Sequence, residues 1–386
     1  MTRRLLVVAR RFWPFCDESC HRLVNWTSIL QRQGFEVTVL TGRWHSSWPA
    51  ESDCREVRLV RLLPAPKSSW TETLFLRNIA TWIAKHRHEF DAIYVDESRS
   101  LLHQIGSSSV RGDLPIIARF AGVPQTMTAG AYALNLITQS VDACRKANIV
   151  VAPNAMAHRQ LQSSGIPADR IARIPDAVSI TVQRDSEARS RAAAALRRVN
   201  QDMAIPGDLK LLLYVGDIDA RTNLNALIRA AIAELDRDRR FRLWIVGDGR
   251  ELRPLYDVVK DAACHHDILF HSPFDHLEEL FQVTDAIICP AAGAGEEFIL
   301  PSAIASGIPI VALESSTYRN SMPNALHAPL LKEPTQRHFE KAIEDLCEHS
   351  EAWKRNAETG RREWVASQFV ENAMNGWFDL LLRTTR

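Results

Sequence analysis

The stretch of sequence that decides the fold runs from residue 211 to residue 249. It begins with LLLYVGD at residues 211–217 and ends with LWIVGDG at residues 243–249. Both open with unbroken apolar runs, which are typical of parallel strands buried on both faces of a sheet. Between them, residues 222–235 have the amphipathic spacing of a helix. The stretch therefore predicts a strand–helix–strand unit whose two strands are parallel.

The same alternation extends outward over the whole chain. Strands are predicted at residues 4–9, 36–41, 55–62, 92–95, 115–120, 149–152, 171–174, 211–215, 242–246, 268–271, 286–289 and 308–313. Helices are predicted at residues 22–33, 74–88, 186–200, 222–235, 251–262, 277–283, 300–306 and 363–386. This order predicts the α/β class, with doubly wound parallel sheets that carry helices on both faces.

The length of the chain predicts two domains. A chain of 386 residues is too long for one ordinary hydrophobic core. We place the junction in the strand-free stretch between residues 176 and 210, which holds a charged, alanine-rich helix. The first domain then covers residues 1–180 and the second covers residues 181–362. The last helix, residues 363–386, is rich in Trp, Phe and Leu, and we expect it to join the first domain.

Composition narrows the class of protein. Hydrophobic residues make up 46% and charged residues 24% of the chain, which is typical of a folded globular protein and excludes a disordered one. The apolar runs fall well short of the roughly 18–20 residues that span a bilayer. The seven cysteines are odd in number and scattered, which favours reduced thiols, a cytoplasmic chain and no metal site.

The two halves of the chain carry opposite charge. Residues 1–175 hold 22 Lys and Arg against 14 Asp and Glu, and the remainder holds 25 against 32. A basic first half would suit an anionic acceptor, a phosphate-bearing carrier or peripheral contact with an anionic membrane. The alternative is that two domains of opposite charge attract each other. No nucleic-acid partner is expected.

Polar residues that follow the predicted strands are candidates for a site, because ligands of open parallel sheets bind outside the carboxyl ends of the strands. These residues are Arg10, Arg11, Arg43, Asp96, Glu97, Arg119, Asp217, Asp248 and the loop at residues 291–297. Two such sheets facing each other would form an interdomain cleft, which suits a two-substrate reaction that excludes water.

Five segments, in order, resemble a known family. They are QGFEVTVLT at residues 33–41, ANIVVA and RIARIP between residues 147 and 175, YVG at residues 214–216, LWIVGDG at residues 243–249, and the stretch from Pro290 to Ala312. Together they resemble the nucleotide-sugar glycosyltransferases of the GT-B fold, in particular the retaining family four. The resemblance implies two facing Rossmann-like domains, the second of which binds the nucleotide-sugar donor.

The resemblance also implies a donor site, at which several of the family's polar residues are replaced. The family's Arg and Lys for the diphosphate align with Asp217 and Thr222, and Arg221 is the nearest substitute for the Lys. The family's two donor glutamates align with Ala294 and Ser302. Glu296 and Glu297 lie close by and are candidate catalytic residues, with ordinary exposed acids of a loop as the alternative. The backbone at Gly216, Gly247, Asp248, Gly293 and Gly295 is also expected at the donor, where free N–H groups at the start of a helix can hold a phosphate.

On the acceptor side, the family's Gly-Gly turn aligns with Asp17 and Glu18, and its frequent active-site His aligns with Ala121. Arg119 is a third catalytic candidate, with a structural ion pair as the alternative, and Asp96 is expected beside the acceptor. The function implied is retaining transfer of a sugar from a nucleotide-sugar to a cytoplasmic glycan, lipid-linked or small acceptor, with no further cofactor. Two alternatives remain: a non-catalytic GT-B partner subunit or glycan- or nucleotide-binding module, and a sugar-nucleotide epimerase.

Overall fold

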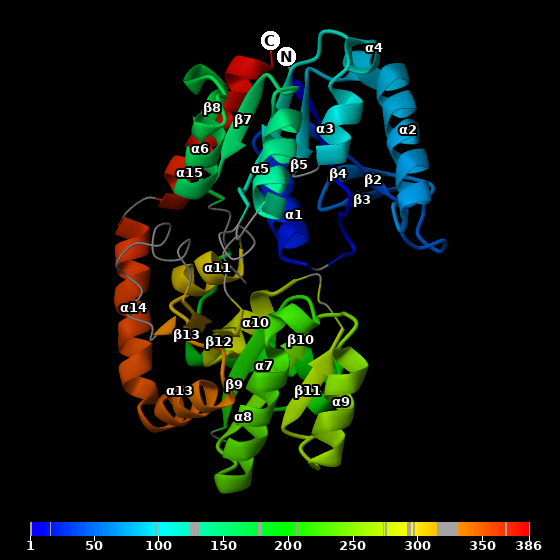
Figure 1. Cartoon of the computed structure of the whole chain (residues 1–386). Coiled ribbons are helices and arrows are strands. Elements are labelled where there is room, and N and C mark those ends of the chain that lie inside the picture. Colours follow the sequence, from blue (N-terminus) through cyan, green and yellow to red (C-terminus); the bar gives the residue numbers. More distant parts are fainter. Residues whose placement is uncertain are drawn as a thin grey trace. The chain divides into compact units, whose positions relative to one another are not determined.

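Two parallel sheets organise the chain in the computed structural model (Figure 1). The structure describes residues 2–15, 17–96, 99–123, 131–176, 180–205, 207, 209–272, 274, 276–291, 295, 298–314, 330–366 and 369–385. Unit 1 comprises Met1–Trp13, Leu23–Asp176 and Glu371–Arg386, and unit 2 comprises Pro14–Arg22 and Ala177–Val370. Each unit is an α/β domain, which confirms the predicted fold class.

The sheet of unit 1 has the strand order β3-β4-β2-β1-β5-β6-β7-β8. Its strands are β1 (Arg3–Val8), β2 (Phe35–Gly42), β3 (Glu51–Cys54), β4 (Val57–Leu62), β5 (Ala92–Asp96), β6 (Ile116–Arg119), β7 (Ile149–Ala152) and β8 (Ile171–Arg173). All pairs are parallel except β3 with β4. The predicted strands are therefore present, and β3 was missed because its short sequence, ESDC, is polar.

Helices of unit 1 cover the sheet through apolar side chains. They are the larger part of α1 (Glu18–Arg32), α2 (Ser69–His86), α3 (Arg99–Ile105), α4 (Ser108–Arg111), α5 (Ala131–Cys144), α6 (Ala155–Ser163) and most of α15 (Phe369–Thr384). Residues of α2, α3, α5 and α6 share one buried cluster with β1 and β5. On α1, Trp26 packs against Tyr94 of β5 and Trp377 of α15, with ring centroids 4.6 and 4.9 Å away. The C-terminal helix α15 therefore completes the core of unit 1.

The sheet of unit 2 has the strand order β11-β10-β9-β12-β13-β14, and all its pairs are parallel. Its strands are β9 (Lys210–Val215), β10 (Phe241–Val246), β11 (Ile268–His271), β12 (Ala286–Cys289), β13 (Ile310–Leu313) and β14 (Leu330–Leu331). Its helices are α7 (Ser186–Val199), α8 (Leu224–Arg237), α9 (Leu252–Asp261), α10 (Glu278–Val283), α11 (Ile299–Ala305), α13 (Gln336–Glu348) and α14 (Ser350–Ala366).

Side chains of β9 point alternately into two separate cores. Leu211 and Leu213 belong to a cluster with α7, α10 and α11, whereas Leu212 and Tyr214 belong to a cluster with α8, α9 and α13. Successive residues of a strand face opposite sides of its sheet. Both faces of the unit 2 sheet are therefore covered, which is why the run at residues 211–215 is apolar without alternation.

The C-terminal apolar stretch differs from the single helix predicted at residues 363–386. It belongs to two helices, α14 and α15. Trp364 on α14 is buried in a core of unit 2, whereas Trp377 on α15 is buried in unit 1. Both parts of the stretch carry large apolar side chains, and the two parts serve different cores.

Candidate functional site

Two glycines bring the ends of β9 and β10 into close contact. Val215 is in register with Val246, and the Gly216 N–H donates to the Val246 carbonyl over 3.0 Å. A Cβ added to Gly247 would lie only 1.9 Å from the Gly216 carbonyl oxygen. No side chain fits in that space, so the two strand ends require glycine at residue 247. Two predicted donor residues, Gly216 and Gly247, therefore lie side by side at the carboxyl edge of the sheet.

The loop after β9 is held by Tyr214. Its buried hydroxyl donates to the Asp217 carbonyl over 2.5 Å, and burial raises the pKa of the phenol. Asp217 itself is exposed. In the neighbouring loop, the carbonyl of Asp248 accepts from the Ile218 N–H over 2.9 Å and its side chain accepts from the Gly249 N–H over 2.7 Å. The structure thus places Asp217 and Asp248 on adjacent loops.

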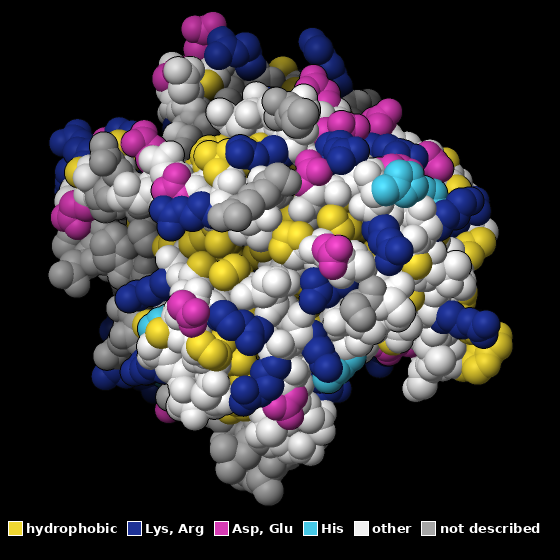
Figure 2. Space-filling model, turned by 90° about the horizontal axis from the view of Figure 1, so that it is seen from above, with side chains coloured by type: hydrophobic (Ala, Val, Ile, Leu, Met, Phe, Trp, Pro, Cys, Tyr) yellow, Lys and Arg dark blue, Asp and Glu magenta, His cyan; other side chains and the backbone are white. Residues whose placement is uncertain are grey.

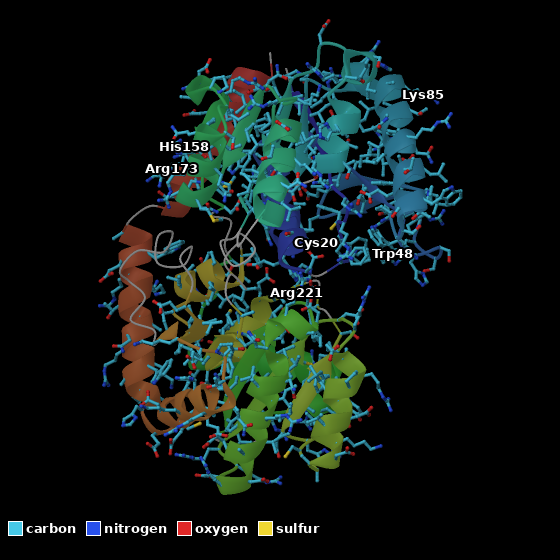
Figure 3. All side chains as sticks on the ribbon, viewed as in Figure 1. Cys20, Trp48, Lys85, His158, Arg173 and Arg221 are labelled. Atoms are coloured by element: carbon cyan, nitrogen blue, oxygen red, sulfur yellow. The ribbon has the colours of Figure 1, made fainter. Side chains whose placement is uncertain are left out.

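Arg221 forms an ion pair within its own turn. Its Nη2 donates to Asp219 Oδ2 over 2.9 Å, and Asp219 Oδ1 accepts from the Arg221 N–H over 2.8 Å. These bonds hold the pKa of Asp219 below its usual range and raise the pKa of Arg221. The Arg221 side chain is 77% exposed (Figure 3), so water screens the pair and little free energy is needed to break it. Sequence analysis missed Asp219.

The loop between β12 and α11 is tied to that turn through Asn223. The residue has a φ of 56°, in the left-handed region, and its Nδ2 donates to the Pro290 carbonyl over 2.9 Å. Farther along the same loop, Gly295 has a φ of +80°, and a Cβ there would lie 2.9 Å from Cys289 Sγ. The Gly295 carbonyl accepts from the Leu300 N–H over 2.8 Å and so opens helix α11.

A carboxylate occupies the start of this helix. Glu18 Oε2 accepts from the Gly295 N–H over 3.0 Å, and Glu18 Oε1 accepts from the Phe298 N–H over 2.7 Å. Next to it, the His21 ring stacks on Phe298 with centroids 5.7 Å apart and planes 9° from parallel. Glu18 and His21 belong to unit 2 through its segment Pro14–Arg22. The resemblance implied an acceptor-side position for Asp17 and Glu18, yet the structure brings Glu18 to the glycine loop predicted for the donor.

Two other predicted residues are buried and have protein partners. Ser302 is fully buried, and its hydroxyl accepts from the Ile180 N–H over 3.1 Å. Arg119 is 1% exposed, and its guanidinium pairs with Asp176, with Nε donating to Oδ1 over 2.9 Å. The structural ion pair that sequence analysis left open for Arg119 is therefore present. On the neighbouring strand, buried Asp96 accepts from the Tyr94 hydroxyl over 2.9 Å.

Glu296, Glu297, Gly293 and Ala294 lie outside the described residues. Within the described ranges, no three His, Cys, Asp or Glu side chains gather as ligands for a metal ion. In the same part of the chain, no helix is both long enough and apolar enough to cross a membrane. On the face shown in Figure 2, Lys and Arg side chains are spread widely, with Asp and Glu among them.

Comparison with protein families identifies the chain. Residues 22–182 match the family model described as Glycosyltransferase Family 4, and residues 209–349 match the one described as Glycosyl transferases group 1. Together with the two parallel-sheet α/β domains, these matches show that the chain belongs to the group 1 glycosyltransferases of the GT-B fold. The resemblance to the GT-B glycosyltransferases that was stated from the sequence is thereby confirmed.

Solved structures show the same fold. Sucrose-phosphate synthase from Thermosynechococcus elongatus is 16% identical with a TM-score of 0.73, and the match covers 99% of this chain and 100% of that one. HepE from Anabaena, in complex with UDP and glucose, is 13% identical with a TM-score of 0.70 and the same coverage. The catalytic domain of starch synthase IV from Arabidopsis thaliana, bound to ADP and acarbose, is 12% identical with a TM-score of 0.67 over both full chains. No curated protein matches the chain.

Proposed function

We propose that the protein transfers a sugar, with retention of configuration, from a nucleoside-diphosphate sugar to a glycan, lipid-linked or small-molecule acceptor. The observation that carries the proposal is the pair of N–H groups at Gly295 and Phe298, which already bind an anion, the Glu18 carboxylate. Backbone N–H groups at the start of a helix are suited to a phosphate because they are fixed donors that need no side chain. Membership of the family supports the same assignment.

The proposed reaction depends mainly on stabilising the negative charge of the leaving diphosphate. In a front-face retaining reaction, the diphosphate itself takes the proton of the acceptor, so a protein base is not required. The protein must then stabilise negative charge as the sugar–phosphate bond breaks, which fixed N–H donors do without reorganisation. Arg221 would add a full positive charge once its exposed pair with Asp219 opens.

A specific set of contacts favours a second candidate, a non-catalytic GT-B subunit or binding module. Three groups that would serve the reaction have partners within the chain. Asp219 pairs with Arg221, Asp176 pairs with Arg119, and the Gly295 N–H donates to Glu18. A chain that had lost its donor would be expected to satisfy these groups internally in this way.

Calorimetric titration of the full chain with UDP, GDP, ADP and UDP-glucose separates the two candidates. If the protein is a transferase, we expect one nucleotide to bind with a dissociation constant on the order of micromolar. Arg221→Ala should then raise that constant about tenfold or more. Arg229→Ala is the matched control, because Arg229 is also exposed, lies on the adjoining helix α8 and, among the described residues, bonds through its side chain to Asn225 alone. Sugar transfer or hydrolysis is then measured with the nucleotide-sugar that binds.

No binding at millimolar nucleotide would reject the transferase and favour the binding module. Binding without transfer or hydrolysis would also favour the module. Equal losses in Arg221→Ala and Arg229→Ala would show that Arg221 acts only through general surface charge.

A further inference from the structure

Arginine and tryptophan gather at the carboxyl edge of the unit 1 sheet. The members of this Arg–Trp cluster are Arg11, Trp13, Arg43, Trp44, Trp48 and Arg61. They come from β4 and from the segments after β1 and β2, two neighbouring parallel strands. Open parallel sheets bind ligands at this edge. Figure 3 shows Trp48 on the segment that follows β2.

Arg61 gives the cluster a buried positive charge. It is 3% exposed, and its guanidinium donates to the Trp13 carbonyl, the Pro49 carbonyl and Ser52 Oγ over 3.2, 3.1 and 2.9 Å. The guanidinium carbon also lies 5.6 Å from the ring centroids of Trp13 and Trp48. No carboxylate of the described residues lies within 4.0 Å of it. The charge is thus held by neutral groups alone, and its Nε has no hydrogen-bond partner among them.

A second charge without a carboxylate partner lies beside it. Arg43 donates from Nε to the Trp48 carbonyl over 2.6 Å and from Nη2 to the Ser46 carbonyl over 2.8 Å. No described carboxylate pairs with Arg43 either. Burial is the main cause that lowers the pKa of Arg61, and repulsion from the like charge of Arg43 lowers it as well. Such repulsion is relieved when an anion binds between like charges.

Nearby acids are already paired with other arginines. Glu72 accepts from Arg10 over 2.6 Å and from the Ser100 hydroxyl over 3.0 Å. Glu51 accepts from Arg58 over 3.3 Å. These two acids therefore do not offset the positive charges of Arg43 and Arg61.

The aromatic members are fixed in place. Trp44 Nε1 donates to the Arg10 carbonyl over 2.9 Å, which ties the segment after β2 to the segment after β1. The guanidinium of exposed Arg11 lies 4.9 Å from the centroid of Trp44. Trp44 and Trp48 are half-buried, so part of each indole is accessible. An indole held in this way offers an apolar surface at little cost in conformational entropy.

We propose that the Arg–Trp cluster binds a sugar that carries an anionic group, a carboxylate or a phosphate. The indole of Trp44 packs against the apolar face of the sugar ring, and Arg43 binds the anion through the guanidinium N–H groups that the Trp48 and Ser46 carbonyls do not take. This inference rests on the proposed function in one respect, that the bound sugar is the acceptor. The acceptor is then an anionic sugar or glycan and not a neutral one.

Calorimetry on the full chain tests the proposal with two anionic probes and their neutral counterparts. Trigalacturonic acid is compared with maltotriose, and glucose 6-phosphate is compared with glucose. At least one anionic probe is expected to bind about tenfold or more tightly than its neutral counterpart, and to weaken as ionic strength rises. The probe that binds better shows whether the recognised group is a carboxylate or a phosphate.

Variants assign the binding to the cluster. Arg43→Gln removes the charge but keeps a donor for the Trp48 carbonyl, and Trp44→Leu removes the aromatic face. Each is expected to weaken the anionic probe about five- to tenfold, whereas Trp44→Phe keeps most of the affinity. Arg77→Gln is the control, because Arg77 is exposed on α2 of the same unit and its guanidinium has no partner within the part of the chain that the structure describes.

The proposal is overturned if neither anionic probe binds at about 10 mM, since a weaker site would contribute less than about 3 kcal/mol. It is equally overturned if the neutral probes bind as tightly, or if folded Arg43→Gln and Trp44→Leu bind like the unaltered protein. Nucleotide titration of the unaltered protein is a separate measurement. If no nucleotide bound, the transferase would be rejected, but the proposal of an anionic-sugar site would be unaffected.

Discussion

The carboxylate of Glu18 accepts a hydrogen bond from the backbone N–H of Phe298 over 2.7 Å, and its second oxygen accepts from Gly295 over 3.0 Å. A carboxylate with two fixed N–H donors resembles a bound phosphate in charge and geometry. The resemblance aligned Glu18 with one glycine of the family's Gly-Gly turn. In this chain, the same position supplies an anion to the loop expected to bind the donor, so a phosphate that used these two N–H groups would have to displace Glu18.

Glu18→Gln is therefore expected to strengthen nucleotide binding. The amide keeps one acceptor for the N–H groups but removes the negative charge that competes with a phosphate. We expect the dissociation constant for the best-binding nucleoside diphosphate to fall about three- to tenfold in calorimetry. The free energy of unfolding should fall by about 1–2 kcal/mol, because one charge-assisted hydrogen bond is weakened. Glu36→Gln, at an exposed position of β2, is the control. Unchanged or weaker nucleotide binding in Glu18→Gln would show that the phosphate does not use these two N–H groups.

Gly247→Ala is expected to destabilise unit 2. Its Cβ would lie 1.9 Å from the Gly216 carbonyl oxygen, so the ends of β9 and β10 would have to separate. We expect the free energy of unfolding in urea to fall by about 2–4 kcal/mol. Gly376→Ala on α15 is the control, since its Cβ would meet Ile174 at an ordinary 3.5 Å. A Gly247→Ala variant as stable as the unaltered protein would contradict this prediction. It would mean that the ends of β9 and β10 can separate at little cost in free energy.

Asp176→Asn tests whether Arg119 has a structural role. The substitution would remove the Asp176 charge that pairs with the Arg119 guanidinium, which is 1% exposed. Breaking a buried ion pair in this way costs about 3–5 kcal/mol, and thermal unfolding should show the loss. The double variant Arg119→Met with Asp176→Leu removes both charges and should recover a large part of it. Should the double variant keep sugar transfer, Arg119 would have no role in the reaction.

Glu358 on α14 gives the stability of the chain a dependence on acid pH. Hydrogen bonds from Arg361 and Arg362 lower the pKa of Glu358 to about 2. A carboxylate whose pKa is lower in the folded state stabilises the fold above its unfolded pKa, roughly 4.3, and the stabilisation is lost as the pH falls toward 2. The side chain is 38% exposed, so we expect only about 1 kcal/mol.

Glu358→Gln should accordingly be less stable than the unaltered protein at pH 7 and equally stable near pH 2. Chemical unfolding at several pH values measures the difference between the two proteins. A difference that stayed constant between pH 7 and pH 2 would show that the charge of Glu358 is not its cause. Glu358 and Arg361 lie against Gly307, just beyond the end of α11.

Amino-acid sequence by itself determined the α/β class, the two domains and most strands. It could do so because a strand buried on both faces must be apolar throughout, and this pattern is local. The runs at residues 149–152, 268–271 and 286–289 are strands with those same bounds in the structure. Short or polar elements such as β3 and β14 were missed, because their pairing partners and not their own residues make them strands.

The partners of the candidate site residues were decided only by tertiary structure. The strand pattern placed Arg119 at a strand end, and the family resemblance aligned Arg221 and Glu18 with site positions. A charged side chain, however, acts according to its nearest opposite charge or donor. Asp219 is two residues from Arg221, Asp176 is 57 residues from Arg119, and the Phe298 N–H is 280 residues from Glu18. Spacing in the sequence does not encode such pairings, because the folding of the backbone brings the partners together. The fold was therefore predictable from the chain alone, whereas the electrostatics of its site were not.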